Sequence, residues 1–376
     1  KHYRDTDCLR KSLSGSCWLL WMGTGKPASD NRVIRMSSIT LQVQTTEPAP
    51  GGATQTVITD YATTAREIEL TTERFDTPGS LTFTCLEDSG VAIPEGSSVE
   101  FSVEGVKMFK GYIFTAERNK DGEVSYTARD QLRYLKANAS YLFQNMTLPQ
   151  IIRQIAADFE LKVGGMEDTG YAFPYLDKEN EGCLDIIFDA LAQTIVQTGK
   201  IYNFYDNCGE LCLTEAKNMF ITTLLGDKSL VTDYTYKRDI DSNTYNRVKL
   251  VRKNKNSGRT DAYIHEDSDT IKKWGLLQYY DEVDENLNEA QIDEMCRQYL
   301  QYYNRVLQTL SLDSIGIPGL RAGMIIPVRI GAVDGLAVSR LMIAEKVTHT
   351  FEGDEHDHTM SIEVKDFGQL GGINIV

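Results

Sequence analysis

The chain has 376 residues, a net charge of −15, 41% hydrophobic residues and 25% charged residues. A chain of this length is expected to form two or three domains and to bury a core without disulfides or metals. The negative charge argues against a nucleic-acid-binding protein, because such a protein needs a basic surface to neutralise phosphates. The apolar run near the start, CWLLWMG, is too short for a membrane span and lacks the flanks of a secretory signal.

The seven cysteines are an odd number, and their spacing contains no CxxC pair. The nearest arrangement is CGELC, in which Cys208 and Cys212 flank a turn. We therefore expect no disulfide framework, as in a protein of a reducing compartment.

The first segment, residues 1–35, differs in composition from the rest of the chain. It holds seven Lys or Arg against three Asp or Glu. Neither helical nor strand periodicity is clear in it. After Met36, the stretch SSITLQVQ is typical of a first strand. Two interpretations stay open: the basic leader is an artefact and the functional chain begins near Met36, or it is an arm that docks on an acidic neighbour.

Residues 36–135 have the hydrophobic pattern of strands. Apolar and polar residues alternate in SLTFTCL, SVEFSVE and GEVSYTAR, as expected for strands with one buried face. Turn signals fall between them, among them Pro78-Gly79 and Asp121-Gly122. Short strands at this spacing are typical of a small barrel or sandwich, so we predict a first β domain here.

Residues 136–228 change to the helical period. The stretch NMTLPQIIRQIAADF has Thr147 followed three residues later by Gln150, which predicts a capping box at the start of a helix. A second helix is predicted to end at Gly199, and KIYNFYDNCGELCLTE is typical of a hairpin. We predict a small α+β domain.

Residues 229–376 return to the strand pattern, interrupted by a helix over about 288–308. Asn288 and Gln291 predict the start of this helix. The sequence therefore predicts an α+β, mainly β fold with two β domains, a small α+β domain between them and a long helix inserted in the second. No strong internal sequence repeat relates the two β domains.

Motifs that carry catalysis are missing from the sequence. It contains no HExxH pair, no GxSxG elbow and no GxGxxG after a strand, and GTGK at 23–26 lacks the spacing of a phosphate loop. We assign no catalytic residue and no cofactor. The tyrosines of YYDE and QYLQYYNR favour an assembly interface over a stacking surface for nucleotides.

One histidine-rich stretch, EGDEHDHT at 352–359, is the best candidate for a site. On a strand, His356 and His358 would point the same way and could share a metal with His349 of a paired strand. Asp354 or Glu352 could complete the set of ligands. The other interpretation is the polar tip of a hairpin between RLMIAEKVTHTF and HTMSIEVKDF. We favour the hairpin and assign no metal.

Three stretches together resemble the XkdQ/YqbQ family of tail proteins, found in PBSX-like defective prophages and related contractile phages of Gram-positive bacteria. They are MFKGYIFTAERNKDGEVSYTARDQLRYLKANASYLFQNMTLPQIIRQIAADFEL, IKKWGLLQ and KVTHTFEGDEHDHTMSIEVKDF. The resemblance covers most of 60–366 and leaves 1–35 uncovered. No single motif is diagnostic, and the order and spacing of all of them carry it.

This resemblance implies a baseplate hub with two tail-tube-like β-barrel domains, three copies of which form a ring of six barrels between the hexameric tail tube and the trimeric spike. The implied partners are further copies of the chain, the tail tube protein, the spike or other baseplate proteins, a LysM-type tail protein and the tape measure. DNA would pass through an acidic lumen without specific binding, and no membrane is involved. The implied location is the virion or tail-like particle, phage or bacteriocin, assembled in the host cytoplasm. Related sequences of the family carry one histidine before TMS, and it matches His358. The histidines of this stretch are therefore expected to be structural.

Two other functions are weighed against a non-enzymatic hub. A metal-dependent, tail-associated cell-wall hydrolase is the alternative, and it would need the histidine-rich stretch as its centre. A secreted carbohydrate-binding protein is disfavoured by the unpaired cysteines and the missing signal sequence.

Overall fold

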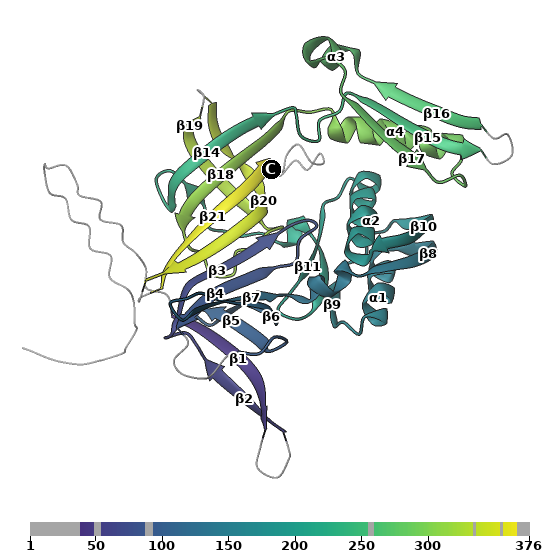
Figure 1. Cartoon of the computed structure of the whole chain (residues 1–376). Helices are drawn as coiled ribbons and strands as arrows, with labels where there is room; N and C mark the ends of the chain where they lie inside the picture. Colours follow the sequence, from purple (N-terminus) through teal and green to yellow (C-terminus); the bar gives the residue numbers. More distant parts are fainter. Residues whose placement is uncertain are drawn as a thin grey trace, which may run out of the picture. The chain divides into compact units, whose positions relative to one another are not determined.

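The fold is mainly β, as the sequence predicts (Figure 1). The computed structural model describes residues 38–48, 54–86, 93–254, 259–333, 336–353 and 356–366. The basic leader 1–35 and two residues of the histidine-rich loop, Asp354 and Glu355, lie outside this part. No helix in the described ranges is long and apolar enough to cross a membrane.

The first β unit contains the strands that precede residue 130. They are β1 (Ile39–Pro48), β2 (Thr54–Asp60), β3 (Ala65–Glu73), β4 (Ser80–Leu86), β5 (Ser98–Val103), β6 (Val106–Arg118) and β7 (Glu123–Arg129). Their hydrogen-bonded order is β3-β4-β7-β6-β5-β1-β2. Leu81, Phe83 and Phe101 alternate inward as their spacing predicts and lie in one core.

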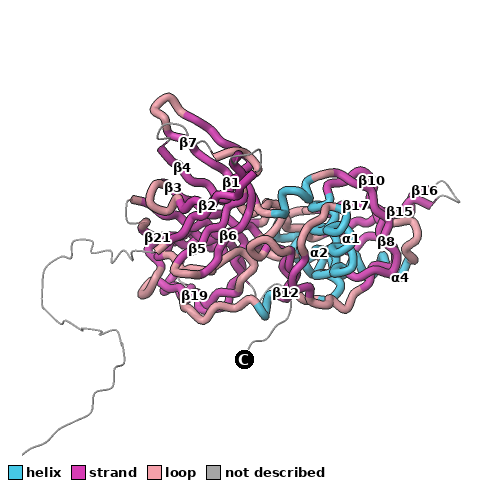
Figure 2. Tube along the Cα trace, turned by 90° about the horizontal axis from the view of Figure 1, so that it is seen from below, coloured by secondary structure: helices cyan, strands magenta, loops and turns pink. Residues whose placement is uncertain are grey.

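The helical unit follows the first β unit. Its elements are the 3-10 helix η1 (Gln131–Lys136), β8 (Asn138–Thr147), α1 (Leu148–Asp158), β9 (Val163–Met166), β10 (Ala172–Gly182), α2 (Cys183–Thr198), β11 (Tyr202–Asp206), β12 (Leu211–Glu215) and the 3-10 helix η2 (Ala216–Asn218). The predicted capping box is present, because the Thr147 backbone N–H donates to Gln150 Oε1 at 2.8 Å. Gly199 ends α2 in the left-handed conformation with φ of 67°. Figure 2 shows the helices gathered apart from the strands of the large sheet.

The second β unit resumes at residue 225. Its strands are β13 (Leu225–Gly226), β14 (Val231–Asp239), β18 (Leu307–Ile315), β19 (Ile325–Val333), β20 (Leu336–Glu352) and β21 (Asp357–Asp366). Their order is β14-β18-β21-β20-β19, with β13 parallel to β19. Residues such as Leu310, Leu312 and Ile362 form a separate core.

The inserted unit interrupts the second β unit between β14 and β18. It contains β15 (Arg247–Asn254), β16 (Arg259–Glu266), α3 (Ser268–Trp274), β17 (Gln278–Val283) and α4 (Glu289–Tyr303). The sequence predicts the helix and a strand in NRVKLVRK but no separate unit, whereas α4 lies on a three-stranded sheet of its own in the order β16-β15-β17. The helix begins at its Asn288 cap and ends at Tyr303 rather than at 308, because residues from Leu307 onward pair with β14 as strand β18.

The two β units repeat one strand order, which no internal sequence repeat indicates. The run β3-β4-β7-β6-β5 in the first unit corresponds to β14-β18-β21-β20-β19 in the second. Both long central strands also skip one residue at the same place. Phe114 is bulged where β6 pairs with β7, and Glu345 is bulged where β20 pairs with β21.

The two units are joined edge to edge into one large sheet. Residues 346–351 of β20 pair antiparallel with residues 68–73 of β3. The resulting path runs from β14 to β2, and in the described part of the chain these two end strands do not pair with each other. Phe351 of β20 reaches across the join and lies in the core of the first β unit.

Candidate functional site

The histidine-rich stretch closes the hairpin of β20 and β21, the predicted location. Glu352 and Asp357 are its last paired residues, and Gly353 and His356 in the turn have positive φ. The His356 Nε2 atom lies 2.6 Å from the backbone oxygen of Ala62. The tip of this hairpin therefore contacts the first β unit, although the hairpin belongs to the second.

His349 and His358 lie opposite each other in the hairpin. His349 Nε2 is 2.8 Å from the Leu320 carbonyl oxygen, and His349 Nδ1 is 2.9 Å from His358 Nε2. A carbonyl can only accept, so His349 Nε2 carries the proton and donates it to Leu320. His349 Nδ1 is then the acceptor, and His358 Nε2–H is the donor.

Both rings are buried and neutral. The exposed fractions of His349 and His358 are 1% and 4%. Burial lowers the pKa of His349 to about 4, and burial together with the neighbouring His349 lowers the pKa of His358 to about 3. The His358 ring stacks on Phe351 with centroids 4.3 Å apart, and a Cβ on Gly316 would overlap it. These contacts make the pair part of the packing between the β units.

The structure thus brings together two of the three candidate metal ligands. His356 binds Ala62 instead of joining the pair, and Asp354 lies outside the described residues. Within the described ranges, no group of three His, Cys, Asp or Glu side chains is placed to hold a metal ion. The five described cysteines, Cys85, Cys183, Cys208, Cys212 and Cys296, are free.

A buried arginine, Arg74, connects three parts of the chain at the end of β3. Its Nε donates to Asn203 Oδ1 of the helical unit at 2.8 Å, and its Nη1 donates to Glu345 Oε1 of the second β unit at 2.9 Å. Asn203 Nδ2 in turn donates to the Gly323 carbonyl at 2.8 Å. Burial would raise the pKa of Glu345, but the charges of Arg74 and Lys365 outweigh it and lower that pKa.

Sequence reasoning missed this junction because its members lie far apart in the chain. The bulge in β20 falls on Glu345, and a bulge redirects the side chain of the extra residue. Bulges leave no recognisable pattern in a single sequence. An arginine that follows a strand is common at protein surfaces, so Arg74 itself gave no signal of the junction.

A buried acidic pair, Asp130 and Asp206, lies at a second contact of the same three parts. Asp130 accepts from the backbone N–H groups of Gly79 and Leu132 at 2.8 and 3.0 Å. Burial and the neighbouring Asp206 raise the pKa of Asp130 to about 8. Arg321 of the second β unit donates to the Asp206 carbonyl at 2.8 Å. Burial therefore favours the neutral form of the Asp130 carboxyl, in a position fixed by backbone donors.

The tyrosines predicted to form an interface lie mainly inside the inserted unit. Tyr279 and Tyr303 stack with centroids 5.2 Å apart, and Tyr299 meets Tyr279 edge to face at 5.5 Å. Tyr280, with 57% of its surface exposed, faces outward. A cavity of about 860 Å³ lies between this cluster and residues of α2 and β10.

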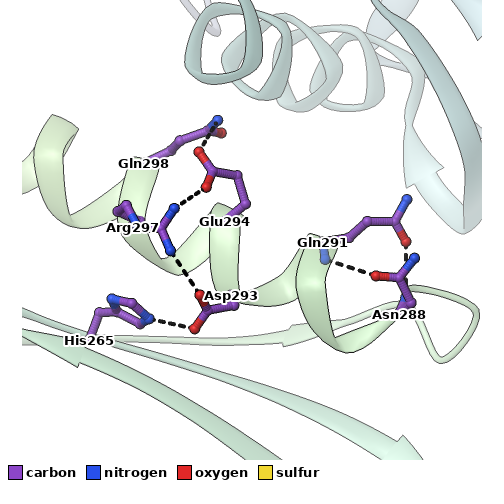
Figure 3. A network of polar contacts seen from close by, with 7 residues as sticks. All are labelled: His265, Asn288, Gln291, Asp293, Glu294, Arg297 and Gln298. Atoms are coloured by element: carbon purple, nitrogen blue, oxygen red, sulfur yellow. Dashed lines mark hydrogen bonds and ion pairs between the residues drawn. The ribbon is translucent and has the colours of Figure 1, made fainter.

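A polar network fixes α4 on its sheet (Figure 3). His265 Nε2 on β16 lies 2.7 Å from Asp293 Oδ1, and Arg297 Nη2 donates to Asp293 Oδ2 at 2.9 Å. The capping box adds reciprocal hydrogen bonds between Asn288 and Gln291 at 2.9 and 3.0 Å. These groups hold the helix in place and satisfy one another.

Comparison with known proteins agrees with this architecture. The YQBQ-like family matches residues 68–365. The chain is 32% identical over 305 residues to the uncharacterised protein YqbQ of Bacillus subtilis (strain 168), covering 79% of this chain and 90% of that one. It is 31% identical over 307 residues to XkdQ of the phage-like element PBSX of the same organism, covering 80% and 92%.

A solved structure also has a similar fold. The 43 kDa tail protein of prophage MuSo2 from Shewanella oneidensis aligns with a TM-score of 0.63 at 15% identity, covering 88% of this chain and 99% of that one. The fold of this chain is therefore similar to that of a phage tail protein. With a family match over most of the described residues and two relatives above 30% identity, the chain belongs to the YqbQ-like family.

Proposed function

We propose that the chain is the structural hub of a phage-type baseplate, three copies of which form a ring between a hexameric tail tube and a trimeric spike. The observation that carries the proposal is the repeated strand order of the two β units. Two equivalent units in each chain allow three chains to present six such units, which matches sixfold symmetry on one side and threefold symmetry on the other.

The family relationship supports the same function. XkdQ is a protein of the phage-like element PBSX, and the Shewanella protein is a prophage tail protein. On this basis we propose that the two β units are tail-tube-like domains and that the helical unit is a separate small domain between them. The proposed partners are the tube protein, the spike or other baseplate proteins, a LysM-type tail protein and the tape measure, in a particle assembled in the host cytoplasm.

The proposal describes a protein that works through its interfaces and does not catalyse a reaction. The alternative, a metal-dependent cell-wall hydrolase, needs a metal centre at the histidine-rich stretch. The buried pairing of His349 with His358 argues against that centre, because neither ring is directed to solvent or to a third ligand.

The test is to locate the chain in assembled tails. Particles carrying a short peptide tag on this chain are imaged with a gold-labelled antibody, and particles tagged on the tube protein serve as the control. We expect gold at one end of the tube only. Label along the tube, or none on intact tails, would contradict the hub.

A peptidoglycan gel assay of the purified chain tests the non-enzymatic part. We expect no clearing of the gel. Clearing that is lost both with a chelator and in His356→Ala would show a hydrolase and contradict this part of the proposal.

A further inference from the structure

The join between the two β units has a defined geometry within one chain. One edge of β20 holds β21 over residues 342–352, and the opposite edge holds β19 up to Ile343 and then β3 from Lys346. Strand β3 holds β4 on its other edge. The contact thus joins the second half of a long central strand to the outer strand of the neighbouring unit.

Each of the two strands in this contact has an equivalent in the other β unit. Within the described residues, that equivalent has no partner strand on the matching edge. β6 corresponds to β20, and it pairs with β5 up to Tyr112 and with β7 from Tyr112 onward. Among the described residues, no strand pairs with Thr115–Glu117 on the β5 side. β14 corresponds to β3, and β18 is its one strand partner in the described part (Figure 1).

Solvent exposure follows the same division. Val347 and His349, in the part of β20 that pairs with β3, are buried, whereas the side chains of Thr115–Glu117 are exposed. The side chains of β14 between Val231 and Tyr236 are exposed as well. Exposed strand edges invite pairing with another chain, and proteins protect them unless they are used.

The registers of the paired strands relate the two units residue by residue. Tyr112 of β6 pairs with Ser98 on one edge and with Arg129 on the other. Ile343 of β20 pairs in the same way with Ile325 and with Lys365, so Tyr112 and Ile343 are equivalent. Each strand then has one bulged residue at the same place, so counting five residues on from each makes Glu117 equivalent to Thr348. By the same steps through β4 and β18, Lys237 is equivalent to Thr71.

Thr348 and Thr71 face each other at the join within the chain, with their hydroxyl oxygens 3.1 Å apart. Transferred to the free edges, that position places Glu117 opposite Lys237 of a second copy. The two charges are opposite, which the strand order alone does not require. Lys237 Nζ bonds Asp239 Oδ2 of its own strand at 3.0 Å, and 66% of its side chain is exposed, so the ammonium can also reach a carboxylate on a neighbouring edge.

We propose that residues 115–117 of β6 pair antiparallel with residues 237–239 of β14 in the next copy of this chain, with Glu117 opposite Lys237. The inference rests on the proposed ring and names its contact. The contact is heterologous, and in the proposed threefold ring it occurs three times, so that contacts within and between chains alternate. Lysine on the exposed edge of β14 disfavours pairing with arbitrary strands, and an acidic residue opposite selects this one.

The first test is a disulfide between the two edges in the full chain. Opposed residues on antiparallel strands have Cβ atoms about 4.5–5.5 Å apart, close enough for a disulfide after a small adjustment. We expect Glu117→Cys combined with Lys237→Cys to give covalently linked dimers and trimers on oxidation. The matched control is Glu117→Cys with Asp233→Cys, on the same edge but four residues out of register, and it should give no more than the parent chain.

The second test is a charge exchange. Glu117→Lys or Lys237→Glu alone places like charges opposite each other, and each should raise the concentration at which trimers form by roughly fivefold. The double variant should return to the parent value. Both positions are exposed, so an unchanged thermal midpoint of the single variants shows that the fold is intact.

The outcomes separate this contact from the proposed hub. Trimers without the 117–237 disulfide, or a double variant no better than the singles, would overturn the strand pairing and leave the hub standing. If the chain stays a single copy in solution, the same oxidation is carried out in purified tails, where a missing disulfide overturns the pairing. A disulfide formed by a chain that is absent from tube ends would support the pairing and refute the hub.

Discussion

Phe351 of the second β unit and Phe101 of the first meet edge to face, with ring centroids 5.2 Å apart. Both side chains are fully buried in the core of the first unit. The first unit therefore has a core that its own strands do not complete.

Removal of the Phe351 side chain should destabilise both β units together. We expect Phe351→Ala to lower the free energy of unfolding by about 3–5 kcal/mol, because it leaves a cavity in a packed core. Urea unfolding followed by far-UV circular dichroism measures it. Tyr280→Ala, at an exposed aromatic position, is the control and should change stability by under about 0.5 kcal/mol. A loss below about 1 kcal/mol in Phe351→Ala would show that the first core does not depend on β20.

The junction at Arg74 should respond differently to single and paired changes. Arg74→Met removes the closer of the two cations that neutralise Glu345, leaves only Lys365 at 3.4 Å, and should cost about 3–5 kcal/mol. Arg74→Met with Glu345→Met removes both charges and should recover most of that loss. Thermal unfolding of the two variants and of Glu345→Met completes a double-mutant cycle. Additive losses would mean that the two side chains do not interact.

The histidine pair predicts a loss of stability in acid. The unfolded chain takes up protons near the ordinary histidine pKa of 6.5, whereas the folded pair resists protonation down to about 4 and about 3. The free energy of unfolding contributed by the pair therefore falls as the pH falls from about 6.5 to about 4. Urea midpoints of the parent and of His349→Gln with His358→Gln, measured across this range, should converge in acid. A constant difference between them would contradict the prediction.

Asp130 predicts a dependence of the opposite sign. Its folded-state pKa of about 8 lies above the unfolded value of 3.8, so the folded chain holds the extra proton between these values. That contribution to stability is complete in acid and is lost as the pH rises towards 8. Asp130→Asn keeps the shape without the ionisable proton, and its stability should fall less than that of the parent between pH 6 and pH 8. Parallel curves for the two proteins would show that Asp130 does not titrate in this range.

Local signals in the sequence were sufficient for elements whose limits are set locally. The start of α1 follows from Thr147 and Gln150, and the end of α2 follows from Gly199, because caps involve residues within one turn of each other. The end of α4 did not follow. Leu307 leaves the helical pattern in order to pair with Asp239, which lies on a strand on the other side of the inserted unit.

The repeat of the two β units was hidden for a related reason. Leu81 and Leu310 occupy equivalent positions, but the two bulged residues are Phe114 and Glu345, and Thr71 corresponds to Lys237. A strand needs only alternating polarity to keep its place, so equivalent strands can differ at most positions. The contact of His356 could not be predicted either, because its partner is a backbone oxygen, which any residue could supply.

The edge-to-edge join has a mechanical consequence. Over six paired positions, from Lys346 with Glu73 to Phe351 with Ile68, β20 and β3 run side by side. A force that slides the units along the strand direction loads all of these hydrogen bonds at once in shear, whereas a force across the strands would open them one at a time. Two β units joined only by a linker would move independently under load, whereas this join makes the two units resist sliding together.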